Sequence, residues 1–333
     1  MKHPGRILAM LGTLVIAGVV FYAGVAILGM PKNQTVWGVS FDSSHARYLG
    51  LDVKASFAQI VGEWQFKKIR LAAHWDNIQK NGPGVYDFSE LDYLMNQARK
   101  SGAKVILAVG QKTPRWPECH RPAWLDTLSD SRAPRLSLLA YIKTVVERYK
   151  NHPALEIWQV ENEPFLAFGL CPKYTATELT EEIALVRSLD ATHPILITDS
   201  GELSSWRRTA RAGDLFGTTM YRVVWNKYLG YLSYDWLPAA FYRFKLWVAG
   251  RNQSAAFVIE LQGEPWIPGQ DPQKLKIEEQ FKSLDLARLK KNILYARAVG
   301  WPRAYLWGAE WWQWMARQGY PEFGEFIKNL PKE

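Results

Sequence analysis

Short apolar runs rich in Val, Ile and Leu recur along the chain after residue 35, and longer segments with helical periodicity separate them. Each run is continuously apolar rather than alternating, which is typical of strands buried on both faces of a parallel sheet. The pattern predicts eight strands, over residues 36–41, 68–72, 104–109, 155–160, 194–198, 215–221, 256–260 and 304–307.

The segments between these runs predict helices. From Glu90 to Lys100, for example, Leu91, Leu94, Met95 and Ala98 recur at the spacing of one helix face. Further helices are predicted over residues 136–149, 178–189 and 284–299. Eight strand–helix units predict an α/β fold, a (β/α)8 TIM barrel. A doubly wound sheet is the alternative, but no glycine-rich phosphate-binding turn follows the first strand.

The N-terminal segment has a different pattern, because residues 7–30 carry no charged side chain. A helix of this length would cross a hydrocarbon core of about 30 Å. Lys2, His3 and Arg6 precede it, and such a positive flank favours a cytoplasmic N-terminus. We therefore expect one N-terminal transmembrane helix that acts as a signal anchor.

This expectation divides the chain into residues 1–30, a cytoplasmic stub with the anchor, and residues 31–333, a catalytic barrel. A cleaved signal peptide is the alternative, since residues 24–26 are small enough for cleavage, although the apolar run is longer than a typical signal sequence. The anchor predicts a single-pass protein of the cell membrane with its barrel outside the cytoplasm, and cleavage predicts a secreted one.

Charge and composition limit the partners. The 333 residues carry a formal net charge of +9, which permits nucleic acid, anionic lipid or an acidic polymer. The basic residues are scattered, and no zinc-finger, helix-turn-helix or RNP signature accompanies them, so we expect no nucleic-acid partner. The 16 Trp residues are unusually many, and such rings either fill a core or line a binding cleft.

Cys119 and Cys171 are the chain's two cysteines, which excludes a disulfide-rich scaffold and a cysteine zinc site. In an oxidising compartment the two could form a disulfide, and two buried free thiols are the alternative. We expect neither a metal nor an organic cofactor.

Two glutamates stand at strand ends, where the active site of a (β/α)8 barrel lies. Glu163 follows the fourth predicted strand and Glu260 closes the seventh. Paired carboxylates suit glycoside cleavage, because one donates a proton to the leaving oxygen and the other meets the positive charge at the anomeric carbon. A separation near 5 Å lets the second carboxylate attack directly and retain configuration.

The triplet Asn162-Glu163-Pro164 and the spacing from Glu163 to Glu260 resemble the clan A glycoside hydrolases, (β/α)8 enzymes whose acid/base glutamate follows an asparagine at the end of strand four and whose nucleophile ends strand seven. Further similarities are Arg70 on strand two, Tyr221 ending strand six, Trp307 ending strand eight and the second loop over residues 85–92. The layout resembles families 5 and 39, and Glu260-Leu261-Gln262 resembles the β-galactosidases of family 42.

This resemblance and the chemistry of the reaction suggest a role for each residue. We expect Glu163 to have a raised pKa and to act as acid/base, and Glu260 to remain ionised as the nucleophile. Arg70 and Tyr221 would support Glu260, and Asn162 would hydrogen-bond the sugar hydroxyl beside the anomeric carbon. Glu264 is the rival nucleophile, and Arg70 could instead pair with a core carboxylate.

Substrate-binding residues are also expected around the two glutamates. They are His74, Trp75, Trp116, Trp307 and Glu310, of which Trp116 and Trp307 would offer apolar faces to sugar rings. The alternatives are that Trp116 packs its own loop and that Glu310 has a structural role.

Residues 223–248 mix many aromatic residues with lysines and arginines, a composition typical of a membrane interface. The segment could rest on a bilayer or form a cleft wall, and ordinary helix packing with a long loop is the alternative. The sequence as a whole predicts a membrane-anchored retaining glycoside hydrolase that cleaves β-linked oligo- or polysaccharides without a cofactor. A catalytically inactive glycan-binding barrel and a transglycosylase are the alternatives.

Overall fold

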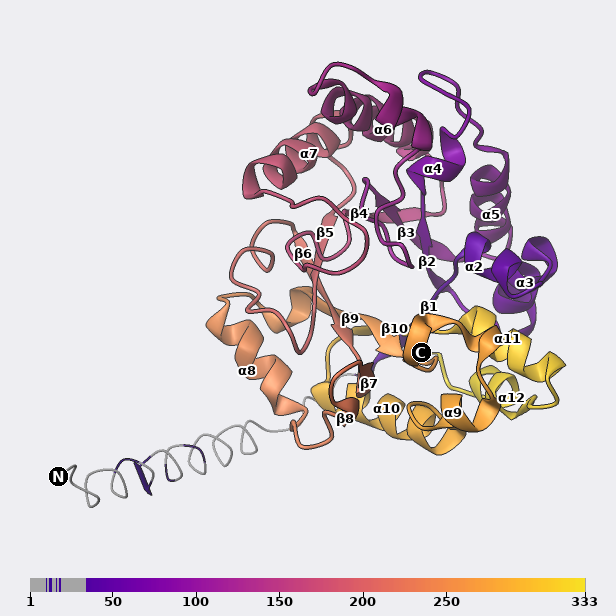
Figure 1. Ribbon diagram of the computed structural model, residues 1–333, viewed down its shortest axis with the longest axis vertical. Helices are drawn as coiled ribbons and strands as arrows, with labels where there is room; N and C mark the ends of the chain where they lie inside the picture. The colour runs from indigo at the N-terminus through magenta and orange to yellow at the C-terminus, as the bar shows by residue number, and fades with distance from the viewer. Residues whose placement is uncertain (1–9, 11, 14–15, 17, 19–33, 333) are drawn as a thin grey trace.

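The computed structural model describes residues 34–332, together with residues 10, 12, 13, 16 and 18. Within these residues, eight parallel strands close into a barrel in the order β1-β10-β9-β6-β5-β4-β3-β2. The helices surround the strands as a ring (Figure 1). The predicted (β/α)8 barrel is therefore confirmed.

The barrel strands match the predicted runs to within two residues at each end. They are β1 (Val36–Ser40), β2 (Lys68–Ala72), β3 (Lys104–Val109), β4 (Leu155–Val160), β5 (Ile195–Asp199), β6 (Leu215–Met220), β9 (Ala256–Gln262) and β10 (Arg303–Trp307). A separate antiparallel hairpin, β7 (Val223–Asn226) with β8 (Gly230–Ser233), follows β6. The seventh and eighth barrel strands are thus β9 and β10.

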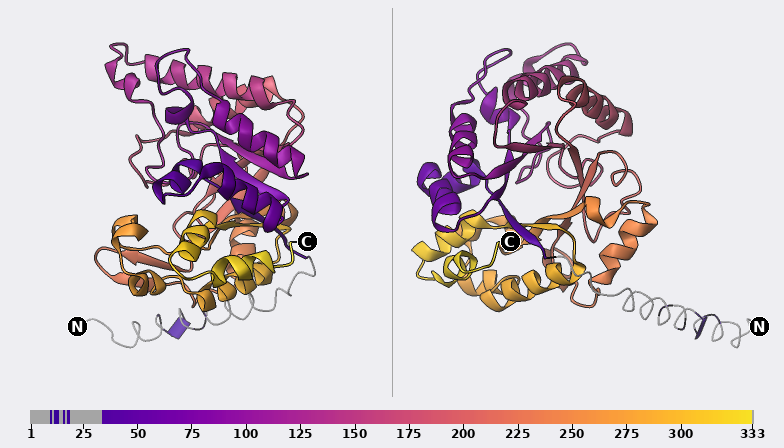
Figure 2. Two further views of the ribbon diagram at one scale, coloured as in Figure 1. Left: turned by 90° about the vertical axis from the view of Figure 1, so that its right-hand side faces the viewer. Right: turned by 180° about the vertical axis from the view of Figure 1, so that it is seen from behind.

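Long helices follow the strands and lie around the barrel in every view (Figure 2). They are α5 (Ser89–Lys100), α6 (Ala133–Tyr149), α7 (Ala176–Leu189), α8 (Ala240–Val248), α10 (Leu286–Val299) and α11 (Ala309–Arg317). Shorter helices are α2 (Ser43–Tyr48), α3 (Val53–Ala58), α4 (Trp75–Ile78), α9 (Ile277–Phe281) and α12 (Glu322–Lys328). One π-helix spans Gln59–Glu63, and 3-10 turns span Ala123–Thr127, Gln253–Ala255, Pro268–Gln270 and Pro272–Lys274.

Local sequence explains where these helices begin and end. A capping box of Thr175 and Glu178 starts α7, since each side chain bonds the other's backbone N–H. The Asp285 carboxylate caps α10, and Gly300 ends it in the left-handed conformation that glycine adopts without steric cost. The boundaries of these two helices therefore follow from local sequence.

The barrel interior and the layer between strands and helices form separate hydrophobic cores. Six buried side chains fill the interior: Ile106, Ile157, Leu196, Phe257, Ile259 and Tyr305. Gly38 on β1 leaves room for the Tyr305 ring, since a Cβ there would lie 2.5 Å from it. Because side chains alternate along a strand, Ile69 and Leu71 pack toward the helices while Arg70 projects inward. This alternation brings a cation to the interior of the barrel.

The expected membrane anchor, residues 7–30, lies outside the described residues except for five positions. Across the part of the chain that the structure does describe, no helix is both long and apolar enough to span a bilayer. The anchor therefore stays a prediction from the sequence.

Candidate active site

The turn after β4 presents Glu163 through an unusual backbone. Glu161 and Glu163 both have positive φ angles, 58° and 44°. The Glu161 carboxylate accepts hydrogen bonds from the backbone N–H groups of Gln111, at 2.8 Å, and Lys112, at 2.6 Å. Gly110 is required beside it, because a Cβ there would lie 2.1 Å from Glu161 Oε1. The Glu161 contacts thus fix the turn that carries Glu163.

Glu260, near the end of β9, has two polar partners from other strands. Arg70 Nη1 on β2 lies 2.5 Å from Glu260 Oε1, and both side chains are almost fully buried. The Tyr221 hydroxyl, just after β6, donates to Glu260 Oε2 at 3.0 Å. One cation and one hydroxyl therefore stabilise the charged carboxylate and fix its orientation.

Asn162 connects this pair to the end of β4. Its Oδ1 accepts from Arg70 Nη2 at 2.9 Å and from the Thr198 hydroxyl at 3.1 Å. The same Thr198 hydroxyl accepts from the backbone N–H of Glu163 at 2.9 Å. These bonds bring the strand-four residues and Glu260 into one network.

Glu163 is buried, and its carboxylate accepts a hydrogen bond from the Thr219 hydroxyl at 3.0 Å. Burial raises the pKa of Glu163 well above its usual range, and the negative charges of Glu260 and Glu118 raise it further, although Lys112 opposes them. A raised pKa favours the protonated form of Glu163, which is the form that a general acid requires.

Glu118 is a third buried carboxylate beside the same pair, and the sequence analysis did not identify it. Its Oε2 accepts from Asn162 Nδ2 at 3.2 Å. Burial raises the pKa of Glu118 to about 7, and the negative charge of Glu260 contributes, while Lys112, Asn162 and Arg70 act in the opposite direction. Three carboxyl groups therefore share one largely buried site.

Glu264, the rival nucleophile, belongs to a neighbouring cluster around Arg115. Arg115 forms ion pairs with Glu264 and with Glu310, the latter at 3.3 Å. Its guanidinium carbon lies 4.1 Å from the centre of the Trp307 ring, and Trp307 Nε1 donates to Glu264 Oε1 at 2.9 Å. The guanidinium thus covers a face of Trp307, which the sequence had suggested as a floor for sugar.

Glu310 is 1% exposed and also accepts from the backbone N–H of Asp42 at 2.5 Å. Burial raises the pKa of Glu310 to about 8, although Arg115 opposes the shift. These partners give Glu310 a structural role in the Arg115 cluster.

His74 and Trp75 are both buried, and their side chains contact other residues of the protein. The two ring nitrogens of His74 contact Thr113 Oγ1 at 2.7 Å and Asp42 Oδ2 at 2.5 Å. Trp75 is fully buried, stacks on Tyr141 with ring centres 5.6 Å apart and belongs to the hydrophobic core. Trp75 therefore offers no face to a sugar, contrary to the expectation, because its ring packs behind the strands.

Aromatic rings form a row from Glu260 to the surface. Tyr221 contacts Trp266, with ring centres 5.0 Å apart, and Trp266 contacts Phe168 at 5.5 Å. Phe168 in turn contacts Trp116 at 6.1 Å, and Trp116 is 51% exposed. Such a row provides apolar faces beside the carboxylates, and its outer member is the Trp116 expected from the sequence.

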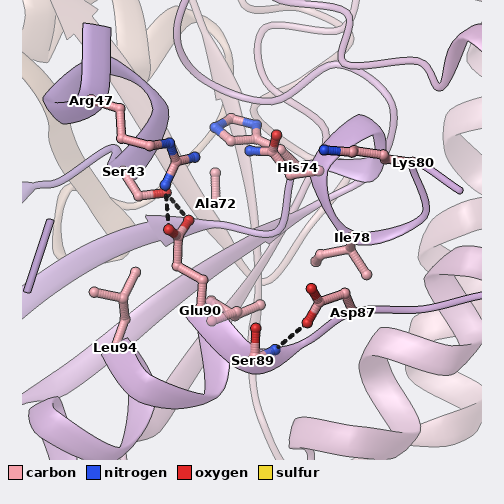
Figure 3. A pocket seen from close by; sticks show the side chains of 12 residues that line it. Ser43, Arg47, Ala72, His74, Ile78, Lys80, Asp87, Ser89, Glu90 and Leu94 are labelled. Carbon is pink, nitrogen blue, oxygen red and sulfur yellow. Dashed lines mark hydrogen bonds and ion pairs between the residues drawn. The ribbon is translucent and has the colours of Figure 1, made fainter.

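The described structure also contains a pocket of about 390 Å³. It is lined by His74 from the loop after β2 and by residues of α2, α4 and α5, including Arg47 and Glu90, which pair with each other (Figure 3). Glu163 and Glu260 are not among its lining residues, so this pocket is separate from the carboxylate pair.

Cys119 and Cys171 form a disulfide, with an S–S distance of 2.09 Å, which links the loops that follow β3 and β4. In residues 34–332 and the few described before them, no three His, Cys, Asp or Glu side chains are grouped to hold a metal ion.

A parallel (β/α)8 barrel with buried glutamates at the ends of its fourth and seventh strands defines the class of protein, one built like the clan A glycoside hydrolases. Residues 29–251 match the family described as "Cellulase (glycosyl hydrolase family 5)". The chain therefore belongs to glycoside hydrolase family 5, a family of glycosidases that hydrolyse O-glycosyl bonds, and the resemblance read from the sequence is confirmed.

Individual relatives match shorter stretches. A probable mannan endo-1,4-beta-mannosidase A-1 of Aspergillus terreus is 28% identical over 134 residues, which cover 38% of this chain and 34% of the relative. A beta-galactosidase of an Arthrobacter species is 36% identical over 98 residues, or 24% of this chain and 14% of the relative. The chain thus spans well under half the length of these curated relatives.

Solved structures share the fold. A family 5 mannosidase from Rhizomucor miehei superposes with a TM-score of 0.57 at 12% identity, covering 84% of this chain and 82% of that one. An endo-1,4-beta-D-mannanase from Thermotoga petrophila superposes with a TM-score of 0.54 at 14% identity, covering 82% and 88%.

Several residues of the site could not be identified from the sequence. Thr198 and Thr219 lie at the ends of β5 and β6. Their position at predicted strand ends is the sequence feature that could have identified them as site residues. Glu118 and Arg115 lie in the long loop after β3, where no periodicity fixes the direction of a side chain.

Proposed function

We propose that the protein is a retaining glycosidase in which Glu163 is the acid/base and Glu260 is the nucleophile. The observation that carries this proposal is the different environment of the two carboxyl groups. Glu163 is buried with a raised pKa, while Glu260 faces the Arg70 guanidinium at 2.5 Å and the Tyr221 hydroxyl at 3.0 Å. Neighbouring carboxyl groups in such different environments suit an acid and a nucleophile.

The reaction proceeds in two steps. Glu163 gives its proton to the leaving oxygen while Glu260 attacks the anomeric carbon, so the glycosidic bond breaks and a glycosyl–enzyme ester forms. Glu163, now ionised, then takes a proton from water, and the resulting hydroxide displaces Glu260 from the sugar. In both steps Asn162 hydrogen-bonds the hydroxyl next to the anomeric carbon.

The substrate class is a β-linked oligo- or polysaccharide. The relatives that carry mannosidase and β-galactosidase names support this class, and the aromatic row that ends at the exposed Trp116 would bind a sugar beyond the cleaved bond. A transglycosylase would use the same first step with a sugar hydroxyl in place of water. A binding barrel without turnover is disfavoured, because both glutamates are present with their partners.

The test is to treat the protein with a panel of activated β-glycosides and with a 2-deoxy-2-fluoro glycoside that traps the glycosyl–enzyme. The expected result is turnover, together with an adduct located by peptide mass on Glu260 and absent from Glu260→Ala. An adduct on Glu264 would overturn the assignment of the nucleophile. Glycan binding without turnover or adduct would favour the inactive barrel.

We propose in addition that residues 7–30 anchor the barrel to the cell membrane on its extracytoplasmic side. The uncharged stretch and its positive flank support this location. Exposed aromatics of the 223–248 segment, Tyr228 at 79%, Trp236 at 70% and Trp247 at 70%, would add an interfacial contact. Membrane fractionation tests it: the full chain should resist an alkaline wash, whereas a chain beginning at Pro31 should be released.

A further inference from the structure

Glu118 is held in place by its own loop. Its backbone N–H donates to the Arg115 carbonyl at 2.7 Å, and its carbonyl accepts from the Thr113 N–H at 2.9 Å. Its φ of 71° is a left-handed conformation that non-glycine residues rarely adopt. Gly169 packs against it so closely that a Cβ there would lie 2.5 Å from Glu118 Cβ. Two loops thus fix the position of this carboxylate.

The carboxylate meets a side chain whose orientation is already determined. Asn162 Oδ1 accepts from Arg70 Nη2 and from the Thr198 hydroxyl, so the amide oxygen faces these donors. The amide nitrogen therefore points away from them and donates to Glu118 Oε2 at 3.2 Å. Glu118 is only 7% exposed, so water cannot easily replace this partner.

Under the proposed function, the contact between Asn162 and Glu118 lies where the sugar would bind. Asn162 Nδ2 is the group that would donate to the sugar hydroxyl at carbon 2. A hydroxyl accepts and donates at the same time. A hydroxyl bound to Asn162 therefore needs an acceptor close to the amide nitrogen, and Glu118 Oε2 is such an acceptor.

We propose that Glu118 is a specificity-determining residue that accepts a hydrogen bond from the carbon-2 hydroxyl of the sugar whose bond is cleaved. Glu118 and Asn162 thus form an acceptor–donor pair for one hydroxyl, and the substrates are glycosides with a free hydroxyl at that position. This inference rests on the proposed function, because it uses the sugar position that Glu260 would attack.

The chemistry of the site agrees with this role. A carboxylate that accepts from a hydroxyl forms a charge-assisted hydrogen bond, which is stronger than a neutral one. Burial raises the pKa of Glu118 to about 7, so a large fraction of this carboxyl group is ionised at slightly alkaline pH. The ionised form is the one that accepts the charge-assisted hydrogen bond. A site built around such a bond discriminates strongly against an analogue that lacks the donor.

The experiment compares two probes of one sugar, an aryl β-glycoside with a carbon-2 hydroxyl and its 2-deoxy-2-fluoro counterpart, on the wild type, Glu118→Ala and Glu118→Gln. Glu118→Ala should lower kcat/KM for the 2-hydroxy substrate by about 10- to 100-fold. The rate of covalent labelling of Glu260 by the fluoro sugar should fall at least about fivefold less, because that probe has no hydroxyl to donate and registers only the effect of Glu118 on its neighbours. Glu118→Gln, which keeps an acceptor oxygen without the charge, should fall between.

Two controls separate recognition from a structural role. The preference between sugars that differ only at carbon 4 should be the same in all three proteins, and near-UV circular dichroism should show intact packing. Equal losses with both probes, or no loss with either, would overturn the role of Glu118 while leaving Glu260 as the labelled nucleophile. Absence of turnover and label in the wild type would instead overturn the proposed function, and this inference with it.

Discussion

Glu260 and Glu264 lie four positions apart near the end of the same strand, and each pairs with an arginine, yet their surroundings differ. Glu260 meets Arg70 and the Tyr221 hydroxyl and lies near two further carboxyl groups, Glu163 and Glu118. Glu264 meets Arg115 and the Trp307 indole instead. Glu260 therefore has the neighbouring carboxyl groups that the proposed reaction needs. Glu264 is held by an arginine and an indole ring instead, so its contacts join loops.

The strongest test of this comparison is to remove each glutamate in turn. Glu260→Gln keeps the size of the side chain but removes the proposed nucleophile, so kcat should fall by about 10⁴-fold or more. Glu264→Gln should keep activity within about tenfold, since it loses one ion pair outside the reacting groups. Steady-state kinetics on one activated glycoside measures both, and the reverse order of effects would show that the clusters have been assigned to the wrong roles.

Replacement of Glu163, the proposed acid, should have a smaller effect that depends on the leaving group. Glu163→Gln cannot donate a proton, so kcat should fall by about 10²- to 10⁴-fold with a basic leaving group. An aryl leaving group of low pKa needs no protonation, so its first step should be much less affected. A loss that is the same across a series of leaving groups would count against Glu163 as the acid.

Removal of Arg115 should lower the free energy of unfolding. Arg115→Ala leaves Glu264 without its cation and Glu310 without a hydrogen-bond donor, and loss of one partner from a buried ion pair costs about 3–5 kcal/mol. Arg187→Ala, which removes a largely exposed pair with Asp214, is the matched control and should cost under about 1 kcal/mol. Urea unfolding measures both, and similar midpoints for the two variants would contradict the structural role of the cluster.

The smallest effect is a pH dependence of stability from Glu310. Its folded-state pKa of about 8 lies above its ordinary value of 4.5, so protonation favours the folded state. The stability that this group contributes is complete below about 4.5 and is lost as the pH rises toward 8. Glu310→Gln removes this dependence. Between pH 5 and pH 8 the Tm of the wild type should therefore fall by about 4 °C more than the Tm of the variant. Parallel melting curves would contradict the shift.

Much of the site followed from the strand ends. Asn162, Glu163, Tyr221 and Glu260 were predicted there because a parallel barrel brings the carboxyl ends of its strands to one mouth, and the structure joins them with Arg70 in one network. The loop residues were harder. Trp75 was expected at the site but is buried in the core, and Glu118 was not expected but lies within the site.

The sequence by itself determined the strand and helix order, the barrel and the two strand-end glutamates, because periodicity and capping are local properties of the chain. Only the tertiary structure decided which arginine meets which glutamate, that Arg115 covers Trp307, and that Glu118 reaches Asn162. These contacts join residues from distant loops. Their geometry depends on backbone turns such as the positive φ of Glu118, for which its local sequence gives no periodic signal.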